Sequence, residues 1–281
     1  MYFVQLRIAR EVRHFVDKPA VWESDSSIAP SEVDESLAQY TGGIVKVERD
    51  LSLMSLGPTP YPNLAHVVLG LESCSYLDSD FVAFCVLNAL MGGGASFSAG
   101  GPGKGMYTRL YADVLNRYPW MFSATSYNIV YADTGLFCIH AACLPPEKLN
   151  EAAAVVLAQF LRMHKSPPEG VELERAKSQL KSQLMMNLEQ RPVVFEDLAR
   201  QVLAHEERKS PLQYMTEIDS IRASDIERVA DRLLSSKISV VGYGDLKQLQ
   251  EYEVLDRAIA KRDLTDVISA KRQRSFSLFV R

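Results

Sequence analysis

With 281 residues and 47% hydrophobic content, the chain can bury a substantial core, which fits one large domain or one domain with part of another. Its formal net charge of -4 argues against a nucleic-acid partner, although a local acidic patch would still suit a basic peptide. No apolar run reaches the roughly 18 residues of a membrane span, and the four cysteines show neither CxxC spacing nor the density of a secreted disulfide scaffold.

The first 43 residues predict a helix followed by a linker. Apolar residues recur at helical spacing from Val4 to Phe15, among basic residues that could imitate an organelle-targeting helix. Glu11 and Asp17 argue against a targeting peptide, because such peptides avoid acids. Prolines and an acidic cluster then predict a linker that ends at residue 43, so a domain is expected over residues 44–281.

The rest of the chain predicts strands and helices in separate groups. In chain order, these are strands over Ile44–Arg49 and Ala65–Glu72, helices over Phe81–Met91 and Met106–Arg117, strands over Trp120–Val130 and Gly135–Leu144, helices over Pro146–His164, Val171–Gln190 and Val193–His205, a helix that begins at a capping box at Ser224, and a strand over Lys237–Tyr243. This grouping predicts an α+β domain of two layers, with a mainly antiparallel sheet packed against helices.

The segment from Gly92 to Gly105 holds seven of the chain's 15 glycines. Glycine permits positive φ angles and lets a ligand backbone approach closely, at an entropic cost that a simple connection would avoid. The residue chemistry favours a peptide-binding or gating loop, with a flexible connector as the alternative. The candidate binding residues are Gly92, Gly93, Gly94, Ser96, Phe97, Ser98, Gly100, Gly101, Gly103, Lys104 and Gly105.

Two nucleotide-binding motifs fail on detail in this segment. Gly103-Lys104 resembles the end of a P-loop, but Gly105 stands where a hydroxyl side chain would hold magnesium, and Ser98 replaces the first glycine. The dinucleotide fingerprint GxGxxG fails as well, because Met106, Tyr107 and Thr108 follow Gly105.

The five histidines do not have the spacing of a catalytic zinc site. The nearest two in sequence, His140 and His164, lie 24 residues apart, whereas such sites commonly place two histidines four residues apart on a helix. The run from His205 to Lys209 begins like HExxH but ends in lysine. The inverted HxxEH form and the serine motif GxSxG are also missing. We therefore predict no catalytic residue and no metal ligand in this chain.

The run from Leu90 to Tyr111 closely resembles the glycine-rich loop of mitochondrial processing peptidase alpha subunits, which belong to the pitrilysin and insulinase-like metallopeptidase superfamily. Ala95 departs from the family, which more often has a fourth consecutive glycine there. The resemblance spans nearly the whole chain and continues through Ala38–Gly43, Val68–Ser73, Val114–Arg117, Glu174–Lys177, Met185–Glu189 and Gly242–Leu246.

The resemblance implies that residues 1–43 are the tail of a first half-domain with its linker, and that residues 44–281 are the C-terminal processing-peptidase-like domain. It also implies a non-catalytic alpha subunit in the mitochondrial matrix, which binds presequences of imported precursors and forms a heterodimer with a beta subunit. Zinc is expected on that beta subunit, and no cofactor in this chain. Within this resemblance, we expect Phe97, Met106 and Tyr107 to contact apolar presequence residues, with packing as the alternative.

The alternative function is that of a structural core subunit of the respiratory cytochrome bc1 complex, which shares the architecture and lies in the inner membrane. The intact glycine-rich loop favours the peptidase, because core subunits with only a scaffolding role generally lack it. Some organisms combine both roles, so an association with the bc1 complex is also compatible with the resemblance.

Overall fold

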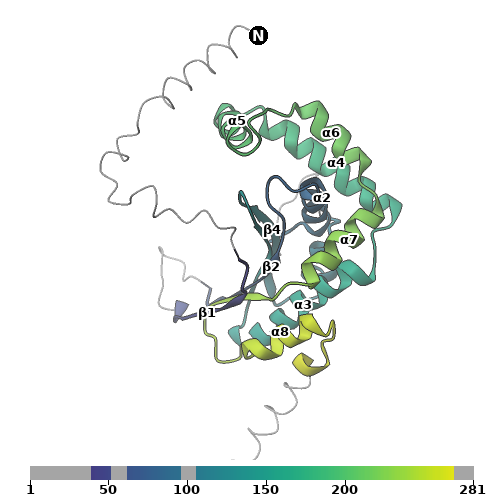
Figure 1. The fold of residues 1–281 in the computed structure, drawn as a ribbon. Helices are drawn as coiled ribbons and strands as arrows, with labels where there is room; N and C mark the ends of the chain where they lie inside the picture. Colours follow the sequence, from purple (N-terminus) through teal and green to yellow (C-terminus); the bar gives the residue numbers. More distant parts are fainter. Residues whose placement is uncertain (1–38, 52–61, 96–105, 269–281) are drawn as a thin grey trace, which may run out of the picture. The chain divides into compact units, whose positions relative to one another are not determined.

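A computed structural model describes residues 39–51, 62–95 and 106–268 of the chain (Figure 1). They belong to one compact unit, Gln39–Arg281. The expected helix near the N-terminus and the linker up to residue 38 lie outside the described residues, and the predicted domain boundary at residue 43 stays a prediction. Within the described part of the chain, no helix combines the length and apolar character needed to cross a membrane.

Within the described residues, six strands form a single sheet in the order β1-β6-β2-β5-β4-β3. Their bounds are β1 Gly43–Glu48, β2 Ala65–Glu72, β3 Gly93–Ala95, β4 Met121–Val130, β5 Gly135–Cys143 and β6 Ser239–Gly244. Neighbouring strands are antiparallel except for the pair β1 and β6, which is parallel. The predicted mainly antiparallel sheet is therefore confirmed.

Helices pack on one face of this sheet, as Figure 1 shows for α2, α3 and α7, and α8 lies against α3. The helix bounds are α2 Phe81–Met91, α3 Leu149–Lys165, α4 Gly170–Asn187, α5 Arg191–His205, α6 Pro211–Ser220, α7 Ala223–Leu234 and α8 Tyr252–Ala260, with a π-helix, η3, at Tyr111–Leu115 and a 3-10 helix, η4, at Pro146–Lys148. The two-layer α+β prediction is confirmed by this arrangement.

Alternation along the strands explains why the core lies between the sheet and the helices. In β2, Val67 and Leu69 are fully buried, whereas their neighbours His66 and Val68 lie half-buried on the opposite face. Phe137 of β5 meets Phe160 of α3 edge to face, with ring centroids 6.3 Å apart. One face of the sheet thus carries the core, and the other carries more exposed side chains.

Three local predictions need correction. The glycine-rich segment does not begin as a loop, because Gly93–Ala95 pair with β4 and form the edge strand β3. The helix predicted from Met106 begins at Arg109, after a turn. Helix α7 begins at Ala223, one residue before Ser224, because the Asp225 carboxylate accepts a hydrogen bond from the Arg222 N–H at 2.9 Å.

Two helices, α6 and α8, escaped the sequence prediction. Helix α6 has a capping box in which the Ser210 hydroxyl accepts from the Gln213 N–H at 3.3 Å and the Gln213 side chain accepts from the Ser210 N–H at 2.6 Å. The sequence Ser210-Pro211-Leu212-Gln213 carries this signal, so α6 was predictable from local pattern.

Candidate functional site

The two ends of the glycine-rich segment meet beside β4. The Thr108 side chain lies against Gly92 so closely that a Cβ on Gly92 would stand 2.4 Å from the Thr108 methyl carbon. The Thr108 hydroxyl also accepts a hydrogen bond from the Gly93 N–H at 3.3 Å. The glycine-rich segment therefore has a closed base. We call this base the loop neck, and it consists of Gly92, Gly93, Gly94 and Thr108.

Crowding of the backbone explains the three glycines of the loop neck. Gly92 and Gly93 have φ angles of +56° and +107°, which side chains rarely adopt. A Cβ on Gly93 would lie 2.0 Å from the Ala124 carbonyl oxygen, and one on Gly94 would lie 2.8 Å from the Tyr111 hydroxyl oxygen. These glycines thus follow from packing, independently of any ligand.

A buried serine on β4 fixes the first residue of the loop neck. Ser126 is only 5% exposed, and its N–H donates to the Gly92 carbonyl at 2.9 Å. Its hydroxyl lies 3.0 Å from the same carbonyl oxygen and 3.2 Å from that of Asn88, near the end of α2. Sequence analysis did not single out Ser126, because its role depends on a strand and a helix end that meet only in the folded chain.

A buried arginine holds the chain that follows the loop neck. Arg109 is 5% exposed and donates to both carboxylate oxygens of Glu172, at 2.8 and 3.0 Å, and to the Ser166 carbonyl at 2.9 Å. A bidentate contact of this kind fixes both the position and the orientation of the Arg109 side chain. The residues after the glycine-rich segment are thereby attached to α4.

Of the eleven predicted binding residues, Gly92, Gly93 and Gly94 are described and lie together at the loop neck. The other eight lie outside the described residues, and their role stays a prediction. They are Ser96, Phe97, Ser98, Gly100, Gly101, Gly103, Lys104 and Gly105.

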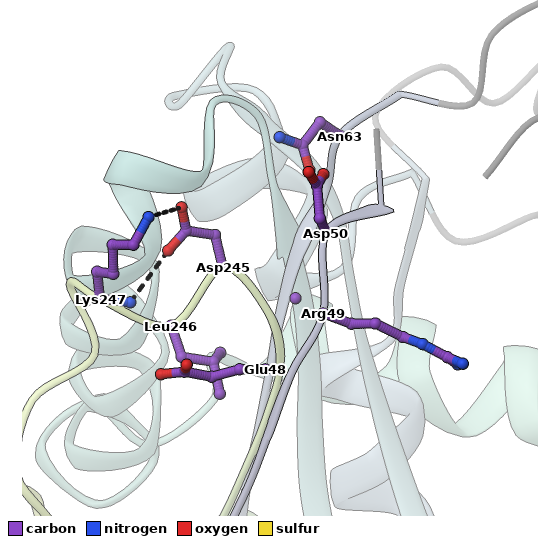
Figure 2. Close-up of a pocket in the computed structure, with 8 residues that line it drawn as sticks. Glu48, Arg49, Asp50, Asn63, Asp245, Leu246 and Lys247 are labelled. Carbon is purple, nitrogen blue, oxygen red and sulfur yellow. Dashed lines mark hydrogen bonds and ion pairs between the residues drawn. The ribbon is translucent and has the colours of Figure 1, made fainter. Parts of the chain in front are cut away.

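Away from the loop neck, a hollow with a volume of about 390 Å³ lies where the parallel strands β1 and β6 end. Asp50 and Asn63 bring side-chain oxygens close together on one side of it, whereas Arg49 extends away (Figure 2). On the other side, the Asp245 carboxylate accepts from the Lys247 ammonium at 3.4 Å. Carboxyl ends of parallel strands often bind ligands, but these acids and bases largely compensate one another, so we assign the hollow no function.

Comparison with known proteins places the chain in a family. The family model described as the peptidase M16 inactive domain matches residues 7–180. The chain belongs to the peptidase M16 family. The description of the matched domain as inactive supports the prediction of a non-catalytic chain.

Curated M16 relatives of this chain are mitochondrial-processing peptidase alpha subunits. The protein from Caenorhabditis elegans is 52% identical over 90% of the chain and 49% of its own length, and that from Bos taurus is 56% identical over 84% of the chain and 44% of its own length. The Homo sapiens protein is 52% identical over 86% of the chain and 45% of its own length. The chain thus spans about half the length of these relatives.

A solved structure supports the M16 fold. A chain of complex III2 from Candida albicans, with Inz-5 bound, covers 84% of this chain and 54% of its own, with a TM-score of 0.68 and 20% sequence identity. At that identity the likeness concerns the fold alone.

Two histidines of this M16 chain meet on the half-buried face of the sheet. His66 Nδ1 of β2 and His140 Nε2 of β5 lie 3.1 Å apart, and the two rings are stacked. Burial lowers the pKa of both histidines, and the neighbouring His140 lowers that of His66 further. Among the described residues, no group of three or more His, Cys, Asp or Glu side chains could hold a metal.

Proposed function

We propose that this chain is a non-catalytic, alpha-type subunit of a mitochondrial processing peptidase. In this role it binds presequences of imported precursors in the mitochondrial matrix and presents them to a beta subunit that carries zinc. The observation that carries the proposal is its identity of 52% and 56% to alpha subunits from Caenorhabditis elegans and Bos taurus, over 90% and 84% of the chain. The match to an inactive M16 domain supports the non-catalytic role.

The geometry of the loop neck supports a division between binding and catalysis. Strand β3 is the edge strand at one end of the sheet. Ser126 and Thr108 hold the chain before the glycine-rich segment, and Arg109 holds the chain after it. A fixed base under a segment rich in glycine suits a ligand that is unstructured when free, because main-chain contacts tolerate many sequences. Hydrolysis would then be carried out by the zinc site of the partner, with its own general base.

The test is an exchange of residues 96–105 for a short polar linker in the chain assembled with a beta subunit. The exchange spares Gly92–Ala95 and Met106–Thr108, because these residues belong to the sheet edge and the loop neck. We expect the affinity for a fluorescent presequence to fall about tenfold or more, with heterodimer assembly unchanged. Unchanged affinity and turnover would refute a substrate-binding role for the segment.

The second candidate function is that of a core subunit of the cytochrome bc1 complex, because the fold of this chain is similar to that of a chain of complex III2 from Candida albicans. Purification of the native assembly separates the two candidates. A beta-type partner with an HxxEH motif supports the peptidase, whereas cytochromes b and c1 support the scaffold. Recovery of all of these together would indicate that one assembly performs both roles.

A further inference from the structure

Arg109 is a buried cation that lies four residues after Gly105, the last residue of the glycine-rich segment. Its Nε and Nη2 groups donate to the two carboxylate oxygens of Glu172, and Nη2 also donates to the Ser166 carbonyl. A buried ion pair adds little net stability, because the desolvation of both charges offsets their attraction. The contribution of Arg109 to the molecule therefore lies in geometry.

The guanidinium of Arg109 joins three segments of the chain at one point. Glu172 lies in the first turn of α4, and Ser166 is the residue that ends α3. Because the guanidinium is planar, contacts to both of these partners fix its direction and, through it, the backbone at residue 109. The loop neck holds Thr108, and Arg109 holds the next residue to the layer of helices.

A second buried charge continues this attachment in the π-helix η3. Asp113 is 9% exposed, and its carboxylate pairs with Arg117 at 3.0 Å and with Arg162 of α3. π-helices are rare and occur frequently at functional sites. Two charges of opposite sign, four residues apart, thus hold the chain after the glycine-rich segment to α3 and α4, and Arg109 is the nearer to that segment.

We propose that Arg109 is a positioning residue for presequence binding, because its contacts to Glu172 and Ser166 hold the chain at the C-terminal end of the glycine-rich segment in place. This inference rests on the function proposed above. Without Arg109, the chain before η3 loses this attachment and has to be ordered whenever a presequence binds. The entropic cost of ordering one or two residues corresponds to about a tenfold loss of affinity. Since hydrolysis takes place on the partner, KM rises and kcat stays nearly constant.

The test compares Arg109→Met with Lys177→Met in the full chain, each assembled with the same beta subunit. Lys177 is the matched control, because it is also 5% exposed and donates to one carboxylate and one carbonyl, those of Glu174 and Asp219. These contacts join α4 to α6. Arg109→Met should raise the KM of a fluorescent presequence about tenfold and change kcat by less than about twofold. Lys177→Met should leave both constants within about twofold of their original values.

Two milder variants separate position from charge. Arg109→Lys keeps the positive charge but lacks the planar fork, so it should still raise KM, by about threefold. Glu172→Gln combined with Arg109→Met should raise KM no further than Arg109→Met alone, because both changes remove the same contact. Fully additive losses would overturn the proposal. If Arg109→Met does not fold, Arg109→Lys and Glu172→Gln, each compared with Lys177→Met, decide the question by the same rise in KM.

Hydrogen exchange gives a readout that needs no presequence. The Ala112 N–H donates to the Thr108 carbonyl at 2.9 Å, in the turn that contains Arg109. This amide should exchange about tenfold faster in Arg109→Met, because the turn is then held less firmly, and at the original rate in Lys177→Met. Equal exchange rates in the unaltered chain and in Arg109→Met would show that Arg109 does not fix this turn, and the inference would be wrong.

The outcomes separate this inference from the proposed function. If the unaltered heterodimer cleaves the presequence and Arg109→Met has the same KM as Lys177→Met, the inference is wrong and the proposed function stands. If Arg109→Met lowers kcat and leaves KM unchanged, Arg109 does not position the chain for binding, and the inference is again wrong. If the unaltered heterodimer neither binds nor cleaves the presequence, both are wrong.

Discussion

The glycines of the loop neck show how the environment of a single residue decides its identity. Gly93 combines a φ of +107° with the Ala124 carbonyl directly in the place of a side chain. Gly170, at the start of α4, has no atom within 4 Å of the position of a Cβ. The sequence alone does not tell which of the two glycines could carry a side chain, and only their surroundings in the fold do.

Gly93→Ala should therefore destabilise the chain by about 3 kcal/mol, from backbone strain together with the clash against β4. Urea unfolding followed by circular dichroism measures this loss. Gly170→Ala is the control, and it should leave the free energy of unfolding unchanged or raise it by up to about 1 kcal/mol, because alanine favours the helix. Equal effects of the two substitutions would contradict the packing account of the loop neck.

Among the helices, α2 matters most for the candidate site, because it leads into the loop neck. Its N-terminal cap Asp80 is 8% exposed and accepts from Arg228 and, at 3.4 Å, from Arg232, both on α7. Arg232 also pairs with Asp78 at 2.8 Å. These contacts fix α2 to a helix about 150 residues later in the chain.

Asp80→Asn should lower the free energy of unfolding by about 1–2 kcal/mol, a modest loss because both arginines are partly exposed. Differential scanning fluorimetry measures the change in melting temperature, and urea unfolding measures the change in the free energy of unfolding. Glu227→Ala, an exposed change on α7 next to Arg228, should have almost no effect. Similar losses in both variants would argue against a specific bond between α2 and α7.

At the scale of the whole molecule, the sheet links stability to pH through His66 and His140. Burial lowers the pKa of both below the ordinary value of 6.5, so the folded chain protonates them less readily than the unfolded chain does. Below about pH 6.5 the unfolded chain binds these protons more readily than the folded chain, and stability falls as the pH falls. Above that pH, the two histidines do not make the stability of the fold depend on pH.

The variant with both His66→Gln and His140→Gln should lose much of this dependence between pH 6.5 and 5. Urea unfolding at a series of pH values gives the slope of the free energy of unfolding against pH for each chain. If the unaltered chain and the double variant show the same slope in that range, the histidine pair does not couple to folding.

The sequence by itself determined the α+β class, most strands and helices, the family resemblance and the glycine-rich segment, because apolar periodicity, prolines and motifs are local properties. Only the tertiary structure decided that Gly92 and Thr108 touch, that Arg109 binds Glu172 and that Tyr107 stands in solvent beside α4. Such contacts join residues that are distant in the chain, and local sequence patterns do not predict them. The glycine-rich segment thereby divides into glycines required by packing at the loop neck and a remainder whose role in binding stays a prediction.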